Sequence, residues 1–440
     1  MITAEYTIPG IHVTDHEVEV PLDWSAPDSG GTIRVFAREL VDPVRRRDDL
    51  PRLLFLQGGP GGKSPRPTAV DGWIGEALKS HRVVLLDQRG TGRSSRIDGR
   101  VLAARGDASA QADHLTRFRA DSIVRDAEHL RRTVFGGGRW STLGQSYGGF
   151  LTLTYLSLAP EGLDACYVTG GLPSVWPDAA EVYRRTYPRV EAKNREFYAR
   201  YPHHVDTVAR IADRLAAGDV VLPSGDPLTV RRFQNLGLDF GMKPGYERMH
   251  WLLDEAFATG DDEPSDTFLA QVEARTGYTD NPLFIALQET LYGAPGSGAT
   301  AWAGQAERDR LPRFAEDARP LLFTGEMVYP WMFEEIRTLR PFRAAVELLA
   351  AREDWSPLYD LDRLAANEVP VAAAVYFDDM YVDANLQLAT AAHVAGTRVW
   401  VTNEYEHDGI GSGRVLSRLL EMVAEFGGPR TGDGAATGRR

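Results

Sequence analysis

The chain has 440 residues, of which 43% are hydrophobic and 25% are charged, and its formal net charge is −13. This size and balance are typical of a soluble globular protein larger than one ordinary domain. The acidic excess argues against nucleic acid or an anionic membrane surface as a partner. No apolar run approaches membrane-spanning length, and no basic segment leads into an apolar stretch at the N-terminus. We therefore expect a cytoplasmic protein that does not enter a membrane.

The first part of the chain alternates between strand-like and helix-like patterns. An opening hairpin, three buried strands and two helices are predicted from apolar spacing and turn residues. In chain order these are the hairpin 11–21 and 32–40, strands 53–56 and 82–86, helix 121–135, strand 140–143 and helix 147–158. The single cysteine, Cys166, lies in the apolar run 165–168 and is expected to be a buried thiol.

The alternation stops at about residue 172. From there to residue 365 the sequence is mainly helical, and strands resume at 371–377 and 398–402. The pattern predicts an α/β fold with a mostly parallel central sheet and an inserted all-α cap. We place the core at 1–171 and 366–428 and the cap at 172–365. The small, polar tail 429–440 is expected to be disordered.

Two glycine clusters point to acyl-transfer chemistry. Residues 144–148 read Gly-Gln-Ser-Tyr-Gly, in which a serine nucleophile, Ser146, occupies a tight strand-to-helix turn. Residues 57–62 read Gln-Gly-Gly-Pro-Gly-Gly and follow a predicted strand. In this arrangement one backbone N–H from each cluster forms an oxyanion hole. The donors would be Tyr147 and Gly59, with Gly58 as an alternative to Gly59.

An acid and a histidine follow in the order expected of an α/β-hydrolase. The strand 371–377 ends in Asp378-Asp379, and His407 follows the last predicted strand. His393 is the competing histidine, but it precedes that strand within an alanine-rich helix. The pair His203-His204 has no further ligand spacing around it, so no metal site is expected and no cofactor is needed.

These motifs together resemble the proline iminopeptidases (prolyl aminopeptidases). The resemblance is carried by segments 58–61, 87–94 and 144–149, and segments 324–331 and 376–383 resemble the larger branch of that family. It extends from about residue 20 to about residue 411. It implies an α/β-hydrolase-fold serine exopeptidase that removes an N-terminal proline. One departure is Gln57, where the family commonly has histidine.

The resemblance also guides the choice of the acid. Asp379 is followed by a loop that resembles the acid turn of the family, so we assign it to the triad with Ser146 and His407. Asp378 is the runner-up and Asp383 a more distant third. Asp87 and Arg89 are expected to brace the floor of the site rather than to contact substrate.

An aminopeptidase must also bind a protonated amine, for which carboxylates are the natural partners. Glu289 and Glu326 lie among apolar and aromatic residues of the predicted cap. A buried carboxylate needs a positive partner, which is either the substrate ammonium or a cap arginine. The resemblance implies paired cap glutamates and favours the ammonium. Tyr329 and Trp331 would form an apolar wall for the pyrrolidine ring, unless they are ordinary cap core.

The sequence therefore predicts a serine aminopeptidase that acts through an acyl-enzyme on small peptides with a free N-terminal proline. A broader aminopeptidase or an esterase of the same fold is the alternative, and a catalytically silent binding protein is the least favoured. The sequence leaves the oligomeric state open.

Overall fold

The computed structural model describes residues 1–258 and 262–429, so nearly all of the predicted tail 429–440 lies outside the described residues. Nine strands form one sheet. They are β1 Ile2–Ile8, β2 Ile11–Pro21, β3 Thr32–Val41, β4 Arg52–Leu56, β5 Arg82–Asp87, β6 Trp140–Gln145, β7 Leu163–Thr169, β8 Val371–Tyr376 and β9 Thr397–Thr402.

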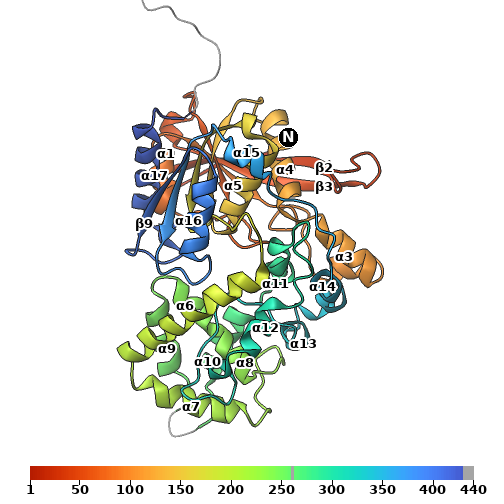
Figure 1. Ribbon diagram of the computed structural model, residues 1–440. Helices are drawn as coiled ribbons and strands as arrows, with labels where there is room; N and C mark the ends of the chain where they lie inside the picture. Colours follow the sequence, from red (N-terminus) through yellow and green to blue (C-terminus); the bar gives the residue numbers. More distant parts are fainter. Residues whose placement is uncertain (259–261, 430–440) are drawn as a thin grey trace, which may run out of the picture.

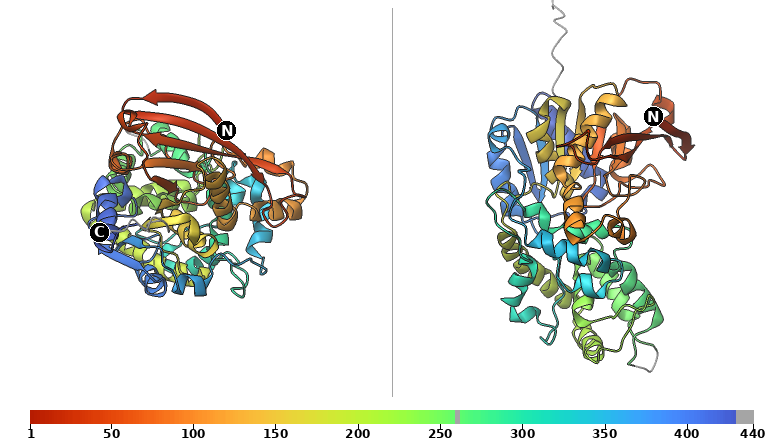
Figure 2. Two further views of the ribbon diagram at one scale, coloured as in Figure 1. Left: turned by 90° about the horizontal axis from the view of Figure 1, so that it is seen from above. Right: turned by 90° about the vertical axis from the view of Figure 1, so that its right-hand side faces the viewer.

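The sheet has the spatial order β1-β2-β3-β5-β4-β6-β7-β8-β9. Strands β1 to β3 pair in antiparallel fashion and join β5, while β5, β4, β6, β7, β8 and β9 are parallel. Figure 2 shows the antiparallel strands along one edge of the sheet. The predicted hairpin is β2 and β3. Strand β1 was not predicted, because it is an edge strand with mostly exposed side chains and thus carries no apolar pattern.

Helices cover both faces of the sheet and fill the segment between β7 and β8 (Figure 1). They are α1 Gly72–Leu78, α2 Gly99–Ala103, α3 Ala108–Thr116, α4 Ala120–Thr133, α5 Tyr147–Leu158, α6 Ala179–Arg200, α7 His204–Leu215, α8 Val230–Gln234, α9 Gly245–Asp254, α10 Asp266–Thr276, α11 Pro282–Leu287, α12 Ala303–Asp309, α13 Met332–Glu335, α14 Arg343–Ala350, α15 Leu361–Ala365, α16 Ala384–His393 and α17 Gly413–Glu425.

Two apolar cores hold these layers together. On one face, α1 and α17 pack against the sheet through residues such as Trp73 and Leu419. On the other face, α4 and α5 contribute Ile123, Leu130 and Leu151 to a larger core that continues into the cap. The core strands read as nearly continuous apolar runs because both of their faces are covered.

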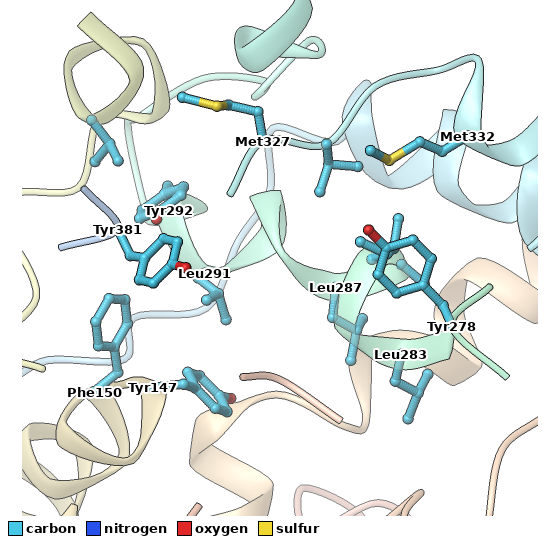
Figure 3. Close-up of a cluster of buried hydrophobic side chains, with 14 of the residues drawn as sticks. Tyr147, Phe150, Tyr278, Leu283, Leu287, Leu291, Tyr292, Met327, Met332 and Tyr381 are labelled. Carbon is cyan, nitrogen blue, oxygen red and sulfur yellow. The ribbon is translucent and has the colours of Figure 1, made fainter. Parts of the chain in front are cut away.

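The segment between β7 and β8 is a helical cap. Within its described residues it forms α6 to α15 and no strand, and Figure 1 shows α6 to α10 in the lower half of the view, with α1 and α17 in the upper half. The cap sits directly on the start of α5. Figure 3 shows Tyr147 and Phe150 of α5 below Leu291, Tyr292 and Tyr381, and all five are buried in one core. The predicted fold class, a mostly parallel α/β sheet with an inserted helical cap, is confirmed.

Among the described residues, no helix is both long and apolar enough to cross a membrane.

Candidate active site

Ser146 occupies a strained turn between β6 and α5. Its φ of 56° and ψ of −123° lie outside the regions that L-residues favour, and such strain persists only where the surroundings hold it. The Ser146 N–H donates to the Thr169 carbonyl at 3.0 Å, and its own carbonyl accepts from Gly149 N at 2.7 Å. A Cβ on Gly148 would lie 1.9 Å from the Leu56 carbonyl oxygen, so glycine is required there. The turn presents Ser146 at the carboxyl end of the sheet.

The glycine loop after β4 lies directly over this serine. A Cβ on Gly58 would stand 2.9 Å from the Ser146 Cβ, which no side chain tolerates. The next residue, Gly59, has a φ of 65° and lines the cavity at Ser146. Tyr147 is the first residue of α5, so its N–H has no acceptor within the helix. The two predicted oxyanion donors therefore belong to loops that meet at Ser146.

His407 lines the same cavity as Ser146 and contacts Asp379. Nδ1 of His407 lies 2.7 Å from Oδ2 of Asp379, and both side chains are buried. The other carboxylate oxygen, Oδ1, accepts backbone N–H groups from Tyr381 at 2.8 Å and Val382 at 3.1 Å. These bonds fix the carboxylate, so His407 donates its Nδ1 proton to it and keeps Nε2 free to act as a base.

The competing acids and the competing histidine lie elsewhere. Asp378 is half-buried and 3.7 Å from Arg189, while Asp383 caps the start of α16. Nε2 of His393 lies 3.1 Å from the Leu361 carbonyl. Of the three aspartates considered from the sequence, only Asp379 contacts His407.

The pKa of His407 is raised above its ordinary value of 6.5. Burial by itself lowers that pKa, but the charge and hydrogen bond of Asp379 outweigh it, and Glu326 adds to the increase. The Tyr381 ring meets the imidazole edge-on at 4.6 Å between centroids. The His407 ring is therefore held in place by both a carboxylate and an aromatic neighbour.

Ser146 and His407 line one cavity of about 560 Å³, which also contains residues of the cap. Its apolar wall comes from Leu238, Met242 and Phe284. Two cap carboxylates line it, Glu326 and Asp280, and Asp280 is paired with Lys63 at 2.7 Å. The cavity thus brings together a serine hydroxyl, an imidazole, an apolar surface and carboxyl groups.

Both predicted cap glutamates carry perturbed carboxyl groups. Burial raises the pKa of Glu289 to about 7, although N–H donors such as Gly304 oppose the shift. Burial likewise raises the pKa of Glu326 to about 7, opposed by His407 and by a hydrogen bond from Gln288. Glu326 reaches the cavity, whereas Glu289 lies behind it, with Oε1 accepting from Gly304 N at 3.0 Å. Neither carboxylate forms an ion pair with an arginine in the described structure.

Tyr329 and Trp331 lie away from the cavity, in the core of the cap. The Tyr329 hydroxyl is 2.9 Å from that of Tyr187, and its ring stacks on Trp331 at 5.9 Å between centroids. Neither residue lines the cavity at Ser146. The interpretation as ordinary cap core, which the sequence left open, describes them better than a substrate wall.

Several residues of the site were not identified from the sequence, among them Leu238 and Met242 of the apolar wall, Phe284 and Gln288. Phe284 covers the oxyanion loop, since a Cβ on Gly59 would lie 3.4 Å from its ring, and Gln288 bonds Glu326. Both come from α11 or its end, where nothing in the sequence distinguishes them from ordinary helix residues. The expected bracing roles fit the contacts: Asp87 binds Arg66 at 2.5 Å, and buried Arg89 binds Asp126 at 2.5 Å.

The structure adds a third histidine to the pair His203-His204. One ring nitrogen from each of His203, His204 and His250 lies within 4.8 Å of the other two. Nε2 of His204 is 2.7 Å from Nδ1 of His250, so these two rings already bond each other. His250 lies in α9, 46 residues along the chain, which is why the spacing gave no sign of it. This cluster could hold a metal ion, but its histidines are not among the residues that line the cavity at Ser146.

Comparison with known proteins shows to which family the chain belongs. Residues 51–219 match the family described as the α/β hydrolase fold. A proline iminopeptidase of Aeromonas sobria is 46% identical over 420 residues, covering 95% of this chain and 98% of the relative. A proline iminopeptidase of Aspergillus aculeatus is 36% identical and covers 89% of each chain. A solved proline iminopeptidase from Mycobacterium smegmatis aligns over 93% of this chain at 15% identity and a TM-score of 0.42. Because the first two relatives match this chain nearly from end to end, the chain belongs to the proline iminopeptidase family.

Proposed function

We propose that the protein is a serine aminopeptidase that releases proline from the N-terminus of small peptides through an acyl-enzyme. The observation that carries this proposal is that Ser146, His407 and Glu326 line one cavity. The first two supply nucleophilic chemistry, and the third supplies a charge that selects a free amine. An esterase would need only Ser146 and His407, so Glu326 is the residue that favours an aminopeptidase.

The chemistry follows from the contacts of His407. Its Nε2 takes the Ser146 proton while Oγ attacks the carbonyl carbon of the proline residue, and Asp379 stabilises the resulting imidazolium. The backbone N–H groups of Gly59 and Tyr147 receive the oxyanion. The tetrahedral intermediate then breaks its C–N bond, and His407 returns the proton to the leaving amine. Water, activated by the same imidazole, hydrolyses the ester and frees proline.

Recognition of the substrate rests on the two glutamates. A lone buried carboxylate is costly, which is why both pKa values rise to about 7. A secondary ammonium at Glu326 would supply the missing positive charge, with Glu289 adding a second negative charge behind it. The pyrrolidine ring would lie against Leu238, Met242 and Phe284.

The test is turnover of proline, alanine, leucine and glycine 2-naphthylamides, with N-acetyl-proline 2-naphthylamide as the control. We expect the proline compound to be cleaved fastest and acetylation to abolish its cleavage, because acetylation removes the positive charge. Equal turnover of the alanine or leucine compound would indicate a broader aminopeptidase. Cleavage of the acetylated compound, or of esters alone, would refute the amine-dependent function.

A further inference from the structure

A second cavity, of about 730 Å³, lies in the cap beside the active-site cavity. It is bounded by α10 and by the loop 277–281 that joins α10 to α11. Four residues line both cavities, namely Leu238, Asp280, Asn281 and Phe284. The larger cavity therefore shares a wall with the space around Ser146, and the proposed reaction steps do not use it.

The amine end of the active-site cavity is closed. The charge of Glu326 raises the pKa of buried Tyr183 and Tyr292, so these side chains lie near it on the side of the cap core. A peptide whose first residue reaches Glu326 cannot extend further in that direction. Its carbonyl would sit at Gly59, against which Phe284 packs. The peptide residues that follow the scissile bond must therefore pass Phe284, one of the four residues that line both cavities.

The lining of the second cavity is suited to a polar chain. Arg232 and Arg275 each have a buried guanidinium nitrogen, Nη2 and Nη1 respectively, without a hydrogen-bond partner. Arg337 is exposed, and within the described residues only its backbone N–H is bonded, to Asp226 at 2.9 Å. These two nitrogens are enclosed by the protein and do not face the cavity space. The exposed guanidinium of Arg337 and the partly exposed one of Arg275 can donate to a carbonyl or carboxylate oxygen.

The acidic residues of this cavity are largely occupied by other partners. Asp226 forms ion pairs with Arg340 at 2.8 Å and with Arg232 at 3.4 Å. Asp280 forms an ion pair with Lys63 at 2.7 Å. Glu273 accepts the Ser224 N–H at 3.2 Å. The guanidinium groups of Arg275 and Arg337 thus remain for a ligand that carries acceptors.

We propose that the residues after the proline of a short peptide occupy this second cavity, where the arginine side chains bind their carbonyls and C-terminal carboxylate. This inference rests on the proposed aminopeptidase function and narrows its substrates to oligopeptides with a free C-terminus.

A steric plug tests the proposal. Ala274 is an exposed residue of α10 that lines the second cavity, and Ala270 lies exposed one turn earlier without lining it. Ala274→Trp should lower kcat/KM for Pro-Ala-Ala-Ala by about tenfold and leave that for proline 2-naphthylamide within about twofold, because only the tetrapeptide needs the cavity. The matched control, Ala270→Trp, should change neither value.

A second variant tests the carboxylate and does not depend on the fold tolerating a tryptophan. Arg337→Gln should lower kcat/KM for Pro-Ala-Ala-Ala but not for its C-terminal amide. Equal losses on tetrapeptide and naphthylamide, or no loss with Ala274→Trp, would overturn occupancy of the cavity. Equal effects of Arg337→Gln on acid and amide would overturn the carboxylate contact. If the parent enzyme cleaves neither substrate, the proposed function itself fails.

Discussion

The substitution Asp379→Asn probes the centre of the proposed mechanism because it changes one atom and keeps the shape of the side chain. In the parent, Oδ1 of Asp379 accepts two backbone N–H groups, and Oδ2 lies 2.7 Å from Nδ1 of His407. An asparagine can keep its oxygen only on the side that faces those two donors. Its NH₂ group then faces His407, which must present Nδ1 as an acceptor and carry its proton on Nε2.

The magnitude follows from that tautomer. An Nε2 that already holds a proton cannot take another from Ser146, so the base is lost although the ring stays in place. The same change in a serine-protease triad costs about 10⁴ in kcat, which corresponds to about 5.4 kcal/mol of transition-state stabilisation. We expect a loss of this order, because the two backbone donors exclude the other orientation of the amide.

The assay is kcat for proline 2-naphthylamide, with thermal unfolding to show that the variant folds. Asp378→Asn is the matched control. Asp378 is half-buried, and its ion pair with Arg189 is a long contact of 3.7 Å. Such a pair contributes little, so the substitution of Asp378 should alter kcat by less than about threefold. A larger loss for Asp378→Asn than for Asp379→Asn would refute the assignment of the acid.

Three further predictions concern the carboxylates and metal dependence. Glu326→Gln should lower kcat/KM for proline 2-naphthylamide by about 10² and spare hydrolysis of p-nitrophenyl acetate, since only the former carries an ammonium; equal losses would contradict amine binding. The pKa of Glu289 in the folded state is raised to about 7 from 4.5, so between these pH values the native state holds a proton that the unfolded state has lost. The contribution of Glu289 to the free energy of unfolding therefore falls by about 3 kcal/mol as the pH rises from 4.5 to 7. Urea unfolding should show a flatter pH dependence for Glu289→Gln, and an unchanged slope would show that burial does not raise this pKa. Prolonged EDTA treatment should leave kcat unchanged, because no proposed step uses a metal; loss of activity restored by Zn²⁺ would assign a role to the histidine cluster.

The sequence determined those features that local backbone chemistry imposes. A serine in a left-handed turn between a strand and a helix needs glycines around it, so the motif at 144–148 identified the turn that the structure contains. The helix from Tyr147 to Leu158 and the strand from Arg82 to Asp87 appear at the predicted positions because apolar runs and breakers act over short distances. The fold class followed from the order of these elements.

The local sequence pattern could not decide between neighbouring residues. Asp378 and Asp379 are adjacent residues of the same type, so the sequence does not distinguish them. Only the turn after β8 directs Asp379 toward His407. From the sequence, Tyr329 and Trp331 fit either an apolar wall of the site or ordinary cap core, and the fold buries both in the cap core. Aromatic content predicts burial and does not say which buried surface faces a ligand.

Contacts between distant segments were decided by tertiary structure alone. Phe284 covers the loop at Gly59, and His250 joins His203 and His204, across separations that no motif records. The physical reason is that the cap is a set of short helices whose mutual placement depends on their shared core rather than on any one segment. Chain order therefore specified the chemistry of the core, and cap packing set the shape and charge of the space above Ser146.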